Sequence, residues 1–547
     1  MRLIEARNFV ETQRISFVEF YGERPKYAIL SHTWESSQEV TYQDSNLESS
    51  KSKTGYQKIR KTCELALSDG FEYVWIDTCC IDKSSSAELT EAINSMFLWY
   101  QEASVCYVYL ADMFQGSSLE DCRWFSRGWT LQELIAPEVI TFFDNSWDRI
   151  GSKNSLMDQL TAITRIDPDI LGHSAPISSA CIAKRLSWAA GRQTTRVEDI
   201  AYCLLGICNI HMPMLYGEGK AAFRRLQEEI IRSTCDLSIL AWTPPHSSDV
   251  PKEEYCGFLA ESVNHFSSCS KMYSVTDSLV DEGDISVSNK GLKLKAEVYL
   301  KNYPDKGYRY SLKLDCMIRG YEGETLIIPM RKVGPNTFVR AHSHISSGSF
   351  KLEICHWGET LFNTVTLLTT MPSLAIRSPS SVASGSKLIS YSRFTLVSIE
   401  LQPEISLKHG SVTPAKCWDV EDFVFFGTRG SRQNWGAFLL ETNTLFICFW
   451  HREDSEWAFE ATLLDTSRPE GSGLWKDLVL LADKPGCDRT TIQNMLNSIE
   501  YENVSSVKTW FKGETIKLSF KVWPAENENL CSGPRWRVVF SKTSCWR

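Results

Sequence analysis

The sequence lacks an apolar run long enough to cross a bilayer, which takes about 18 residues. Charged residues interrupt the N-terminal stretch at Arg2, Glu5 and Arg7, so it also lacks the apolar centre of a secretory signal. These two absences predict no membrane partner and a cytoplasmic location.

The chain also has fewer basic than acidic residues. The chain carries 58 Lys and Arg against 67 Asp and Glu, a formal net charge of −9. Nucleic-acid-binding surfaces gather basic residues on one face or stripe, and no long basic run offsets the acidic balance. The sequence therefore predicts no nucleic-acid partner.

The cysteine pattern of a zinc site is missing as well. The 18 cysteines are scattered without paired Cys-x-x-Cys motifs, and Cys79 and Cys80 are adjacent rather than spaced as a metal clamp. Cys106, Cys203 and Cys208 lie inside apolar runs, where a reduced thiol behaves as a small buried hydrophobe. We therefore predict no metal site.

What the chain does have is the composition of a globular protein, with 43% hydrophobic and 23% charged residues over 547 positions. Its first 165 residues alternate short apolar runs with stretches of helical periodicity. Strands are predicted at 27–32, 73–79, 105–112 and 139–144, and helices at 55–69, 87–103, 126–136 and 155–164. This alternation predicts an α/β domain with a flavodoxin-like or TIR-like parallel sheet.

The pattern changes twice after that domain. Residues 166–242 show helical spacing and form a predicted helical extension, which ends at the Pro- and Ser-rich stretch 243–248. Residues 250–547 contain short alternating β-branched and aromatic runs, which predict a mostly antiparallel sandwich or barrel. Asn289-Lys290-Gly291 is a predicted hairpin turn, and the Ser-rich stretch 377–387 a predicted loop.

Polar clusters follow the predicted strands of the first domain. Ser31-His32-Thr33-Trp34 ends the first strand, Asp77 to Asp82 follows the second, and Arg127 to Glu133 precedes the fourth. Ligands of open α/β sheets bind at the carboxyl ends of the strands. The three clusters are therefore expected to meet in one site.

Three segments carry a family resemblance: YAILSHTW at 27–34, YVWIDTCCIDK at 73–83 and RGWTLQEL at 127–134. Together they resemble the fungal heterokaryon incompatibility (HET) domain, and residues 195–230 resemble the helical segment that commonly follows it. HET domains are associated with vegetative incompatibility, in which fused, genetically different fungal cells die. The family is similar to TIR domains, which often self-associate and in some cases hydrolyse NAD. The resemblance implies non-self recognition, programmed cell death and self-association.

The TIR comparison implies a catalytic role for Glu133. NAD-cleaving TIR domains carry a Trp-x-x-x-Glu element, which Trp129 to Glu133 matches. A carboxylate suits the reaction because cleavage of the nicotinamide–ribose bond builds oxocarbenium character on the sugar. NAD would be a substrate, and no cofactor is implied. The alternative is that Trp129 is a core residue and Glu133 pairs with a neighbouring base.

The other candidates would bind substrate. His32 would contact phosphate or ribose, or is a structural histidine. Asp77 and Asp82 would contact ribose hydroxyls, or Asp82 caps the next helix. Arg127 would bind a pyrophosphate or brace Glu133, and Trp34 would pack. The substrate-binding set is Ser31, His32, Trp34, Asp77, Asp82, Arg127 and Trp129.

Two functional hypotheses follow. In the first, the chain is an NAD glycohydrolase that is activated by self-assembly and arrests or kills the cell. In the second, the HET domain is a non-catalytic adaptor that docks to itself or to a partner. The β-rich half would act as a sensor, a repressor or a docking surface for a protein partner.

Overall fold

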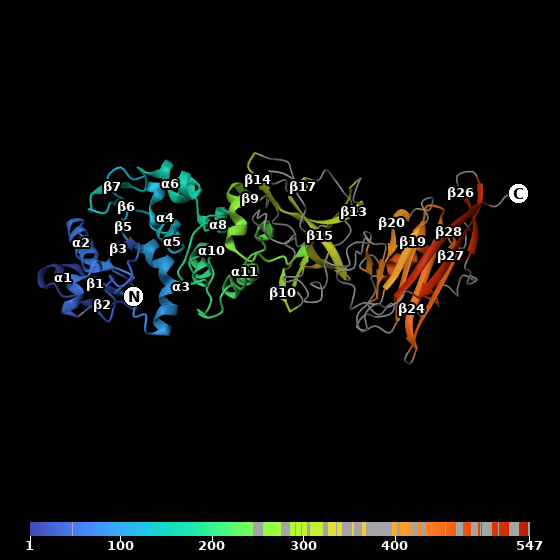
Figure 1. Ribbon diagram of the computed structural model, residues 1–547, viewed down its shortest axis with the longest axis horizontal. Helices are drawn as coiled ribbons and strands as arrows, with labels where there is room; N and C mark the ends of the chain where they lie inside the picture. Colours follow the sequence, from blue (N-terminus) through green and yellow to red (C-terminus); the bar gives the residue numbers. More distant parts are fainter. Residues whose placement is uncertain are drawn as a thin grey trace. The chain divides into compact units, whose positions relative to one another are not determined.

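The computed structural model places the helices and strands in the order that Figure 1 shows. It describes residues 1–45, 47–243, 255–274, 285–289, 291–296, 298–303, 307–320, 326–334, 336–341, 353–354, 364–367, 396–401, 405, 407–414, 417–419, 424–427, 433–453, 456–466, 474–482, 491–492, 494, 506–511, 514–524 and 535–544. The predicted loop at 377–387 and most of the predicted boundary at 243–248 lie outside these residues.

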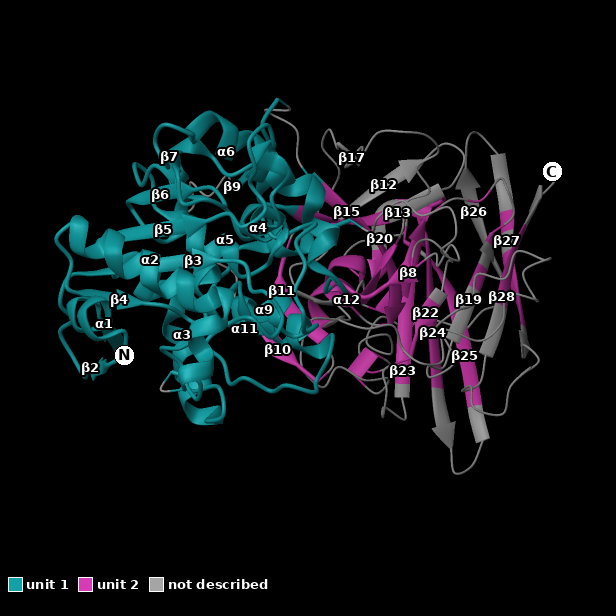
Figure 2. Ribbon diagram, turned by 60° about the vertical axis from the view of Figure 1, so that its left-hand side comes forward, with its two compact units in different colours: residues 1–250, 259–282, 314–326 teal, residues 251–258, 283–313, 327–547 magenta. Residues whose placement is uncertain are grey.

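The chain divides into two compact units (Figure 2). Unit 1 consists of Met1–Val250, Leu259–Glu282 and Leu314–Leu326. Unit 2 consists of Pro251–Phe258, Gly283–Lys313 and Ile327–Arg547. The division of the sequence into segments 1–165, 166–242 and 250–547 stays a prediction.

A seven-stranded sheet forms the centre of unit 1, in the order β2-β1-β4-β3-β5-β6-β7. Its four inner strands are parallel: β3 (Tyr27–His32), β4 (Tyr73–Trp75), β5 (Val105–Tyr109) and β6 (Ile140–Phe143). In chain order these strands are arranged 2-1-3-4, which is the flavodoxin-like order. The predicted fold class is confirmed.

The edges of this sheet are antiparallel and had no clear signal in the sequence. β1 (Arg2–Glu5) and β2 (Phe17–Glu19) form one edge, and β7 (Arg149–Ser152) forms the other. A parallel sheet of short strands that is closed by antiparallel edges is a mixed sheet, as many α/β proteins have.

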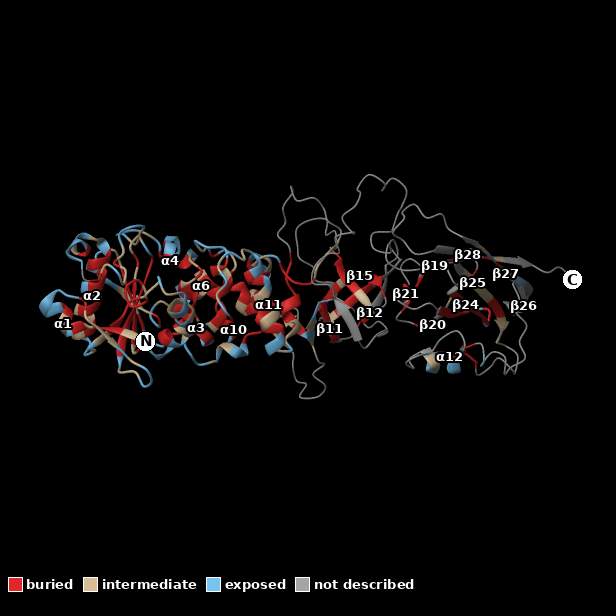
Figure 3. Cartoon of the chain, turned by 90° about the horizontal axis from the view of Figure 1, so that it is seen from below, coloured by how far each residue is buried: buried red, intermediate tan, exposed pale blue. Residues whose placement is uncertain are grey.

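Helices cover both faces of the parallel strands. α2 (Thr54–Ser68) packs on β3 and β4, whereas α5 (Thr130–Ile135) packs on β3 and on α3 (Ser86–Glu102). Right-handed crossovers to opposite sides of β3 place these helices on opposite faces. All six residues of β3 are therefore buried, and Figure 3 shows the inner strands as the buried centre of the unit.

The predicted helix at 126–136 is in fact two short helices, α4 (Arg123–Ser126) and α5. Between them, Arg127 forms an isolated parallel bridge with Gln193. The Gly128 N–H donates to the Gln193 carbonyl at 2.8 Å, and the Gln193 N–H donates to the Ser126 carbonyl at 2.7 Å. These long-range bonds replace the helical bonds that local periodicity predicts.

The rest of unit 1 is mainly helical. It comprises α1 (Ala6–Thr12), α6 (Met157–Thr164), α7 (Pro168–Leu171), α8 (Ile182–Ser187), α9 (Asp199–Tyr202), α10 (Leu205–Cys208), α11 (Ala221–Ser233) and 3-10 turns that include η5 (Val263–Lys271), with β9 (Met272–Ser274) paired to β14 (Cys316–Ile318). Cys106, Cys203 and Cys208 are buried as predicted.

Unit 2 is built of strands that are mostly antiparallel, as predicted. One sheet holds β10 (Ser286–Ser288), β11 (Gly291–Lys295), β18 (Thr364–Leu367), β16 (Thr337–Ala341), β15 (Leu326–Gly334), β13 (Gly307–Leu314) and β12 (Val298–Tyr303), with β8 (Tyr255–Cys256) on β16 and β17 (Glu353–Ile354) on β15. The pairing of Ser288 with Gly291 confirms the predicted hairpin.

Two further sheets of unit 2 share one core. The first holds β21 (Trp418–Asp419), β22 (Val424–Phe426), β19 (Leu396–Leu401), β28 (Arg535–Ser544), β27 (Glu514–Pro524) and β26 (Ser506–Phe511); the second holds β20 (Leu407–Thr413), β23 (Gln433–Leu440), β24 (Thr444–Glu453) and β25 (Glu456–Asp465). Phe425 and Phe540 of the first sheet pack with Phe438 and Phe446 of the second. This face-to-face packing is that of a β-sandwich.

The opposite face of β23 and β24 is covered by α12 (Leu474–Ala482). Ala437 and Ile447 pack there with Leu474 and Leu478. Successive side chains of a strand alternate between faces, so two covered faces explain why β24 is apolar at consecutive positions.

Within the described ranges, none of the helices combines the length and apolar character that a membrane-spanning helix requires.

Gly206 allows α10 to approach α3 closely. A Cβ at position 206 would lie 2.1 Å from Cβ of Phe97. We therefore expect Gly206→Ala to destabilise unit 1 by about 1–3 kcal/mol, because overpacking exceeds the gain in helix propensity. Urea unfolding measures the change.

The matched control is Gly22→Ala, since a Cβ at that glycine would meet nothing within 4 Å. The control should stay within about 0.5 kcal/mol of wild type. Equal stability of Gly206→Ala and wild type would mean that α10 and α3 do not pack in this way.

Candidate functional site

The candidate site lies at the carboxyl ends of β3 and β4. Ser31 and His32 are the last residues of β3, and Asp77 follows the end of β4. Glu133 comes from α5, on the crossover between β5 and β6. The crossover from β3 leads to β4 on one side of it, and the next crossover leads from β4 to β5 on its other side. The chain therefore reverses direction at β3, which is the topological switch point at which open α/β sheets bind ligands.

Glu133 is buried under the end of β3, with only 7% of its surface exposed. The Ser31 hydroxyl donates to its Oε2 at 2.5 Å, and the indole N–H of Trp124 donates to the Ser31 hydroxyl oxygen at 2.7 Å. Tyr100 hydrogen-bonds to the same carboxyl group and donates its own proton to the Leu30 carbonyl at 3.1 Å.

These hydrogen bonds act on the protonation of Glu133. Trp124 donates to Ser31 and Ser31 donates to Glu133, and a bond from a donor favours the ionised carboxylate. Tyr100, whose hydroxyl donates to the Leu30 carbonyl, also lowers the pKa of Glu133.

Burial and charge favour the neutral state of Glu133 and outweigh these bonds. Burial and the negative charge of Asp77 raise the pKa of Glu133 from 4.5 to about 8, against the opposing effects of the Ser31 bond, Arg127 and Tyr100. At neutral pH the carboxyl group is therefore mostly neutral.

His32 faces Asp77 from the end of β3. Its Nε2 lies 3.3 Å from Asp77 Oδ1, although the two atoms are not aligned as a hydrogen bond. The other carboxylate oxygen of Asp77 accepts from the indole N–H of Trp34 at 2.9 Å. Burial raises the pKa of Asp77, but His32, Lys83 and Arg127 outweigh that effect and hold it below its usual range.

Lys58 sets the tautomer of His32. Its ammonium lies 3.3 Å from Nδ1 of His32 and also contacts the Thr33 carbonyl at 3.2 Å and Glu39 Oε1 at 2.7 Å. An ammonium group only donates, so Nδ1 accepts and the ring proton sits on Nε2. The imidazole therefore directs its N–H toward Asp77.

Two cationic side chains lie in the field of Asp77. The Lys83 ammonium sits 3.5 Å from the ring centre of Trp34, a cation–π contact. Arg127 is half-buried and acts electrostatically on both Asp77 and Glu133, yet within the described part of the chain its guanidinium has no ion-pair partner. This cation is available to an anionic ligand.

Arg192 fixes the start of α5. It is 8% exposed, and its Nη1 donates to the Arg127 carbonyl at 2.8 Å and to the Thr130 hydroxyl at 3.1 Å. Burial lowers the pKa of Arg192 to about 10, so it stays charged at neutral pH. The helical extension thereby positions the helix that carries Glu133.

Two predicted site residues have other partners. The indole of Trp129 hydrogen-bonds to Asp199 of α9. Asp82 accepts from the Ser84 N–H at 2.9 Å in a turn before α3, whose N-cap is Ser85. The remaining candidates, Ser31, His32, Trp34, Asp77, Arg127 and Glu133, belong to the arrangement above.

The thiol of Cys79, which follows β4, is fully buried. A hydrogen bond with Cys80 and burial raise the pKa of the Cys79 thiol well above its ordinary value, so the thiolate is absent at neutral pH. Among the residues that the structure describes, no group of three His, Cys, Asp or Glu side chains is placed to hold a metal ion.

Sequence reasoning missed Trp124, Tyr100, Lys58 and Arg192. One of them left a signal, because Lys58 lies on the face of α2 that buries Ile59 and Thr62. A charged residue on a buried helical face calls for a polar partner. The others are aromatic or basic residues whose partners lie far away in the sequence.

Comparison with known proteins finds two matching families and one curated relative. The family described as "Heterokaryon incompatibility protein (HET)" matches residues 27–120, and a "Domain of unknown function (DUF8212)" matches residues 221–289. The "Vegetative incompatibility protein HET-E-1" of Podospora anserina is 43% identical over 261 residues, which cover 44% of this chain. The match spans 19% of that relative's length.

A crystal structure of a Xerocomus chrysenteron lectin aligns with 27% of this chain and 97% of its own chain. The TM-score is 0.16 and the sequence identity 9%, so this likeness carries no argument about fold or ligand.

The protonated state of Glu133 has a consequence for stability. In the window between pH 5 and 8 the folded protein holds a proton at Glu133 that the unfolded chain has released, so stability falls as pH rises. Glu133→Gln keeps a neutral group of the same shape and removes this dependence. We expect the melting temperature of wild type to fall by several degrees more than that of the variant across this window.

The control is Glu138→Gln, which changes an exposed carboxylate five residues away and should keep the wild-type pH dependence. Parallel curves for wild type and Glu133→Gln would show that Glu133 is ionised in the folded state.

Proposed function

The first unit of this chain carries a heterokaryon incompatibility (HET) domain, and we propose that the protein is an incompatibility-type cell-death effector that cleaves NAD at Glu133. The observation that carries the proposal is the buried carboxyl group at the switch point of the sheet, beside Asp77 and beside Arg127, which has no ion-pair partner among the described residues. Carboxyl groups with strongly shifted pKa values cluster at functional sites.

The neutral state of Glu133 is the resting state in this proposal. NAD carries a cationic nicotinamide ring, and a positive charge nearby lowers the pKa of a buried acid. Binding of the ring would therefore drive the proton off Glu133. The same burial that holds the acid neutral would make the resulting carboxylate a strong electrostatic partner of the ring.

Cleavage then breaks the bond between the ribose C1′ and the nicotinamide nitrogen. The bonding electrons go to the nitrogen, so the ring leaves as a neutral molecule. Positive charge builds on C1′ and is stabilised by the Glu133 carboxylate. Water adds to C1′, and its released proton returns to Glu133.

The neighbouring side chains supply binding groups. Arg127 would hold the pyrophosphate of NAD, since a guanidinium pairs with phosphate oxygens bidentately. Asp77, held in place by His32 and Trp34, would accept from ribose hydroxyls. Asp82 is not part of the proposed site because Ser84 already uses its carboxylate.

Access to Glu133 requires movement of the loops after β3 and β4. Trp34 and Lys83 come from these two loops and contact each other, and Trp34 also binds Asp77. We propose that self-association of the HET domain separates these loops, and that a protein partner of the β-rich unit controls the step.

A second candidate function is a non-catalytic adaptor. It is favoured by one observation: Glu133 is buried, its pKa is raised by that burial, and it accepts a hydrogen bond from Ser31, as a structural residue would. In that case the HET domain would act by docking alone, and the carboxyl group would serve only to hold α5 against β3.

Glu133→Gln separates the two functions because the amide preserves the shape of the neutral acid. In a fungal host with inducible expression of the full chain, cell killing and NAD consumption should both fall, with turnover reduced about 10²–10⁴-fold. Glu138→Gln should kill and consume NAD as wild type does. Viability and NAD content are measured in the same cultures, with protein levels matched.

Killing by Glu133→Gln at the wild-type level would establish the adaptor function and end the enzymatic one. If Glu133→Gln no longer kills, but expression of the wild type leaves the NAD content unchanged, Glu133 acts on another substrate.

A further inference from the structure

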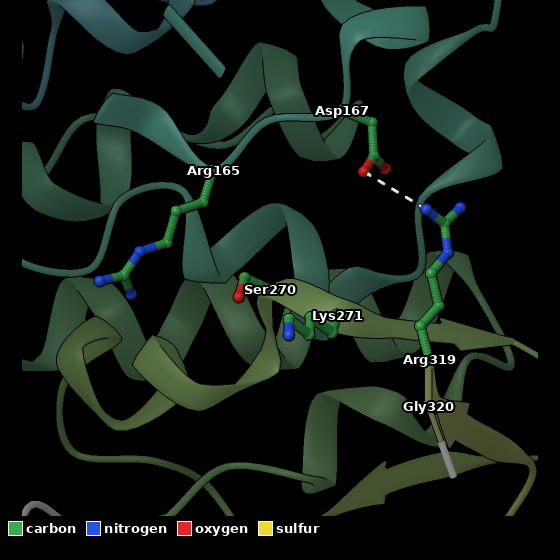
Figure 4. Close-up of a pocket in the computed structure, with 6 residues that line it drawn as sticks. All are labelled: Arg165, Asp167, Ser270, Lys271, Arg319 and Gly320. Atoms are coloured by element: carbon green, nitrogen blue, oxygen red, sulfur yellow. Dashed lines mark ion pairs between the residues drawn. The ribbon is translucent and has the colours of Figure 1, made fainter. Parts of the chain in front are cut away.

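Unit 1 contains a second polar arrangement, a hollow of about 710 Å³ built from elements that the Glu133 site does not use. Its lining is formed by Arg165, Asp167, Ser270, Lys271, Arg319 and Gly320 (Figure 4). The hollow is within the size range of small-molecule sites in proteins.

Three separate segments are held around the hollow. Arg165 ends α6 in a left-handed conformation with φ of 60°, a position where helices usually have glycine or asparagine. Lys271 ends η5, and Arg319 follows β14. The Arg319 N–H donates to the Lys271 carbonyl at 3.0 Å, which ties two of the segments together.

The hollow has an excess of positive charge. The one carboxylate among the described lining residues, Asp167, forms an ion pair with Lys184, whose side chain is 4% exposed, so the charge of Asp167 is neutralised. Arg319 Nη1 lies 3.8 Å from the other oxygen of Asp167, and Figure 4 shows the guanidinium directed toward it. Within the described residues, Arg165 and Lys271 have no ion-pair partner.

We propose that this hollow binds a small molecule that carries a pyrophosphate group, as a nucleoside di- or triphosphate does. Arg319 offers a planar donor pair that Asp167 already orients, and Lys271 offers a point charge from another part of the lining. The Ser270 hydroxyl adds a neutral donor. Arg165 lies at the rim, and its exposed side chain can turn toward a bound anion.

This site is open to solvent, whereas the Glu133 site is buried. Lys271 is exposed and the Arg319 side chain is 65% exposed, so a ligand reaches the hollow without loop movement. The hollow joins residues 165–167 to 270–271, and the latter lie within the segment that matches the domain of unknown function. Ligand binding would therefore stabilise unit 1 by cross-linking these segments.

Calorimetric titration of the full chain tests the proposal, with inorganic pyrophosphate, orthophosphate, ATP and adenosine as probes. Pyrophosphate and ATP should bind saturably with one site per chain, orthophosphate more weakly, and adenosine not at all. The double variant Lys271→Gln/Arg319→Gln should weaken pyrophosphate binding at least tenfold.

The matched control is Arg60→Gln/Lys61→Gln on α2, which removes the same two charges from exposed positions of unit 1. It should bind pyrophosphate as wild type does. If the circular dichroism spectrum shows that the double variant is not folded, Arg165→Gln is tested in its place. This variant should bind pyrophosphate severalfold more weakly than wild type.

The proposal is overturned if wild type shows no saturable pyrophosphate binding, or if both double variants lose affinity equally. It is also overturned if Lys271→Gln/Arg319→Gln binds as wild type does, which would place the anion elsewhere, such as beside Arg127.

Discussion

The candidate site depends on the hydrogen bond from the Ser31 hydroxyl to the carboxyl group of Glu133. It joins the end of β3 to α5 across 102 positions of sequence, and Trp124 completes it from a third segment. A buried carboxylate without a charge partner costs far more than a neutral acid in a hydrogen-bonded chain. Burial and the nearby negative charge of Asp77 therefore favour the neutral form, against the opposing effects of the Ser31 and Tyr100 hydroxyls.

The neighbouring carboxyl group, that of Asp77, is held in the ionised state instead. Asp77 stays ionised because His32, Lys83 and Arg127 surround it with donors and positive charge. Two carboxyl groups at one sheet edge thus have pKa values that are pushed apart, the pattern by which acid and base roles are divided in active sites. Arg192 and the 126–130 backbone keep this division in place by fixing where α5 begins.

The sequence was sufficient for those features that arise from local patterning. β3 is found at the predicted residues because a strand covered on both faces is a continuous apolar run. Parallel topology then places Ser31, His32 and Asp77 at one edge. The break between α4 and α5 was missed because it depends on bonds to Gln193, and the role of Trp124 was missed because its partner is Ser31.

Contacts between residues far apart in the sequence also limited what could be predicted for unit 2. Alternating aromatic and β-branched residues predicted a mostly antiparallel β-rich region, which the structure has. They did not predict that β19 pairs in parallel with β28, because register between distant strands is decided by packing rather than by local sequence.

The protonation of Glu133 is the central claim, and carbon-13 NMR of side-chain-labelled glutamate measures it directly. The carboxyl resonance of Glu133 is assigned by its loss in Glu133→Gln. We predict the chemical shift of a protonated acid at pH 6.5, with a titration midpoint near 8. A carboxylate shift at pH 6.5, unchanged up to pH 9, would contradict the account.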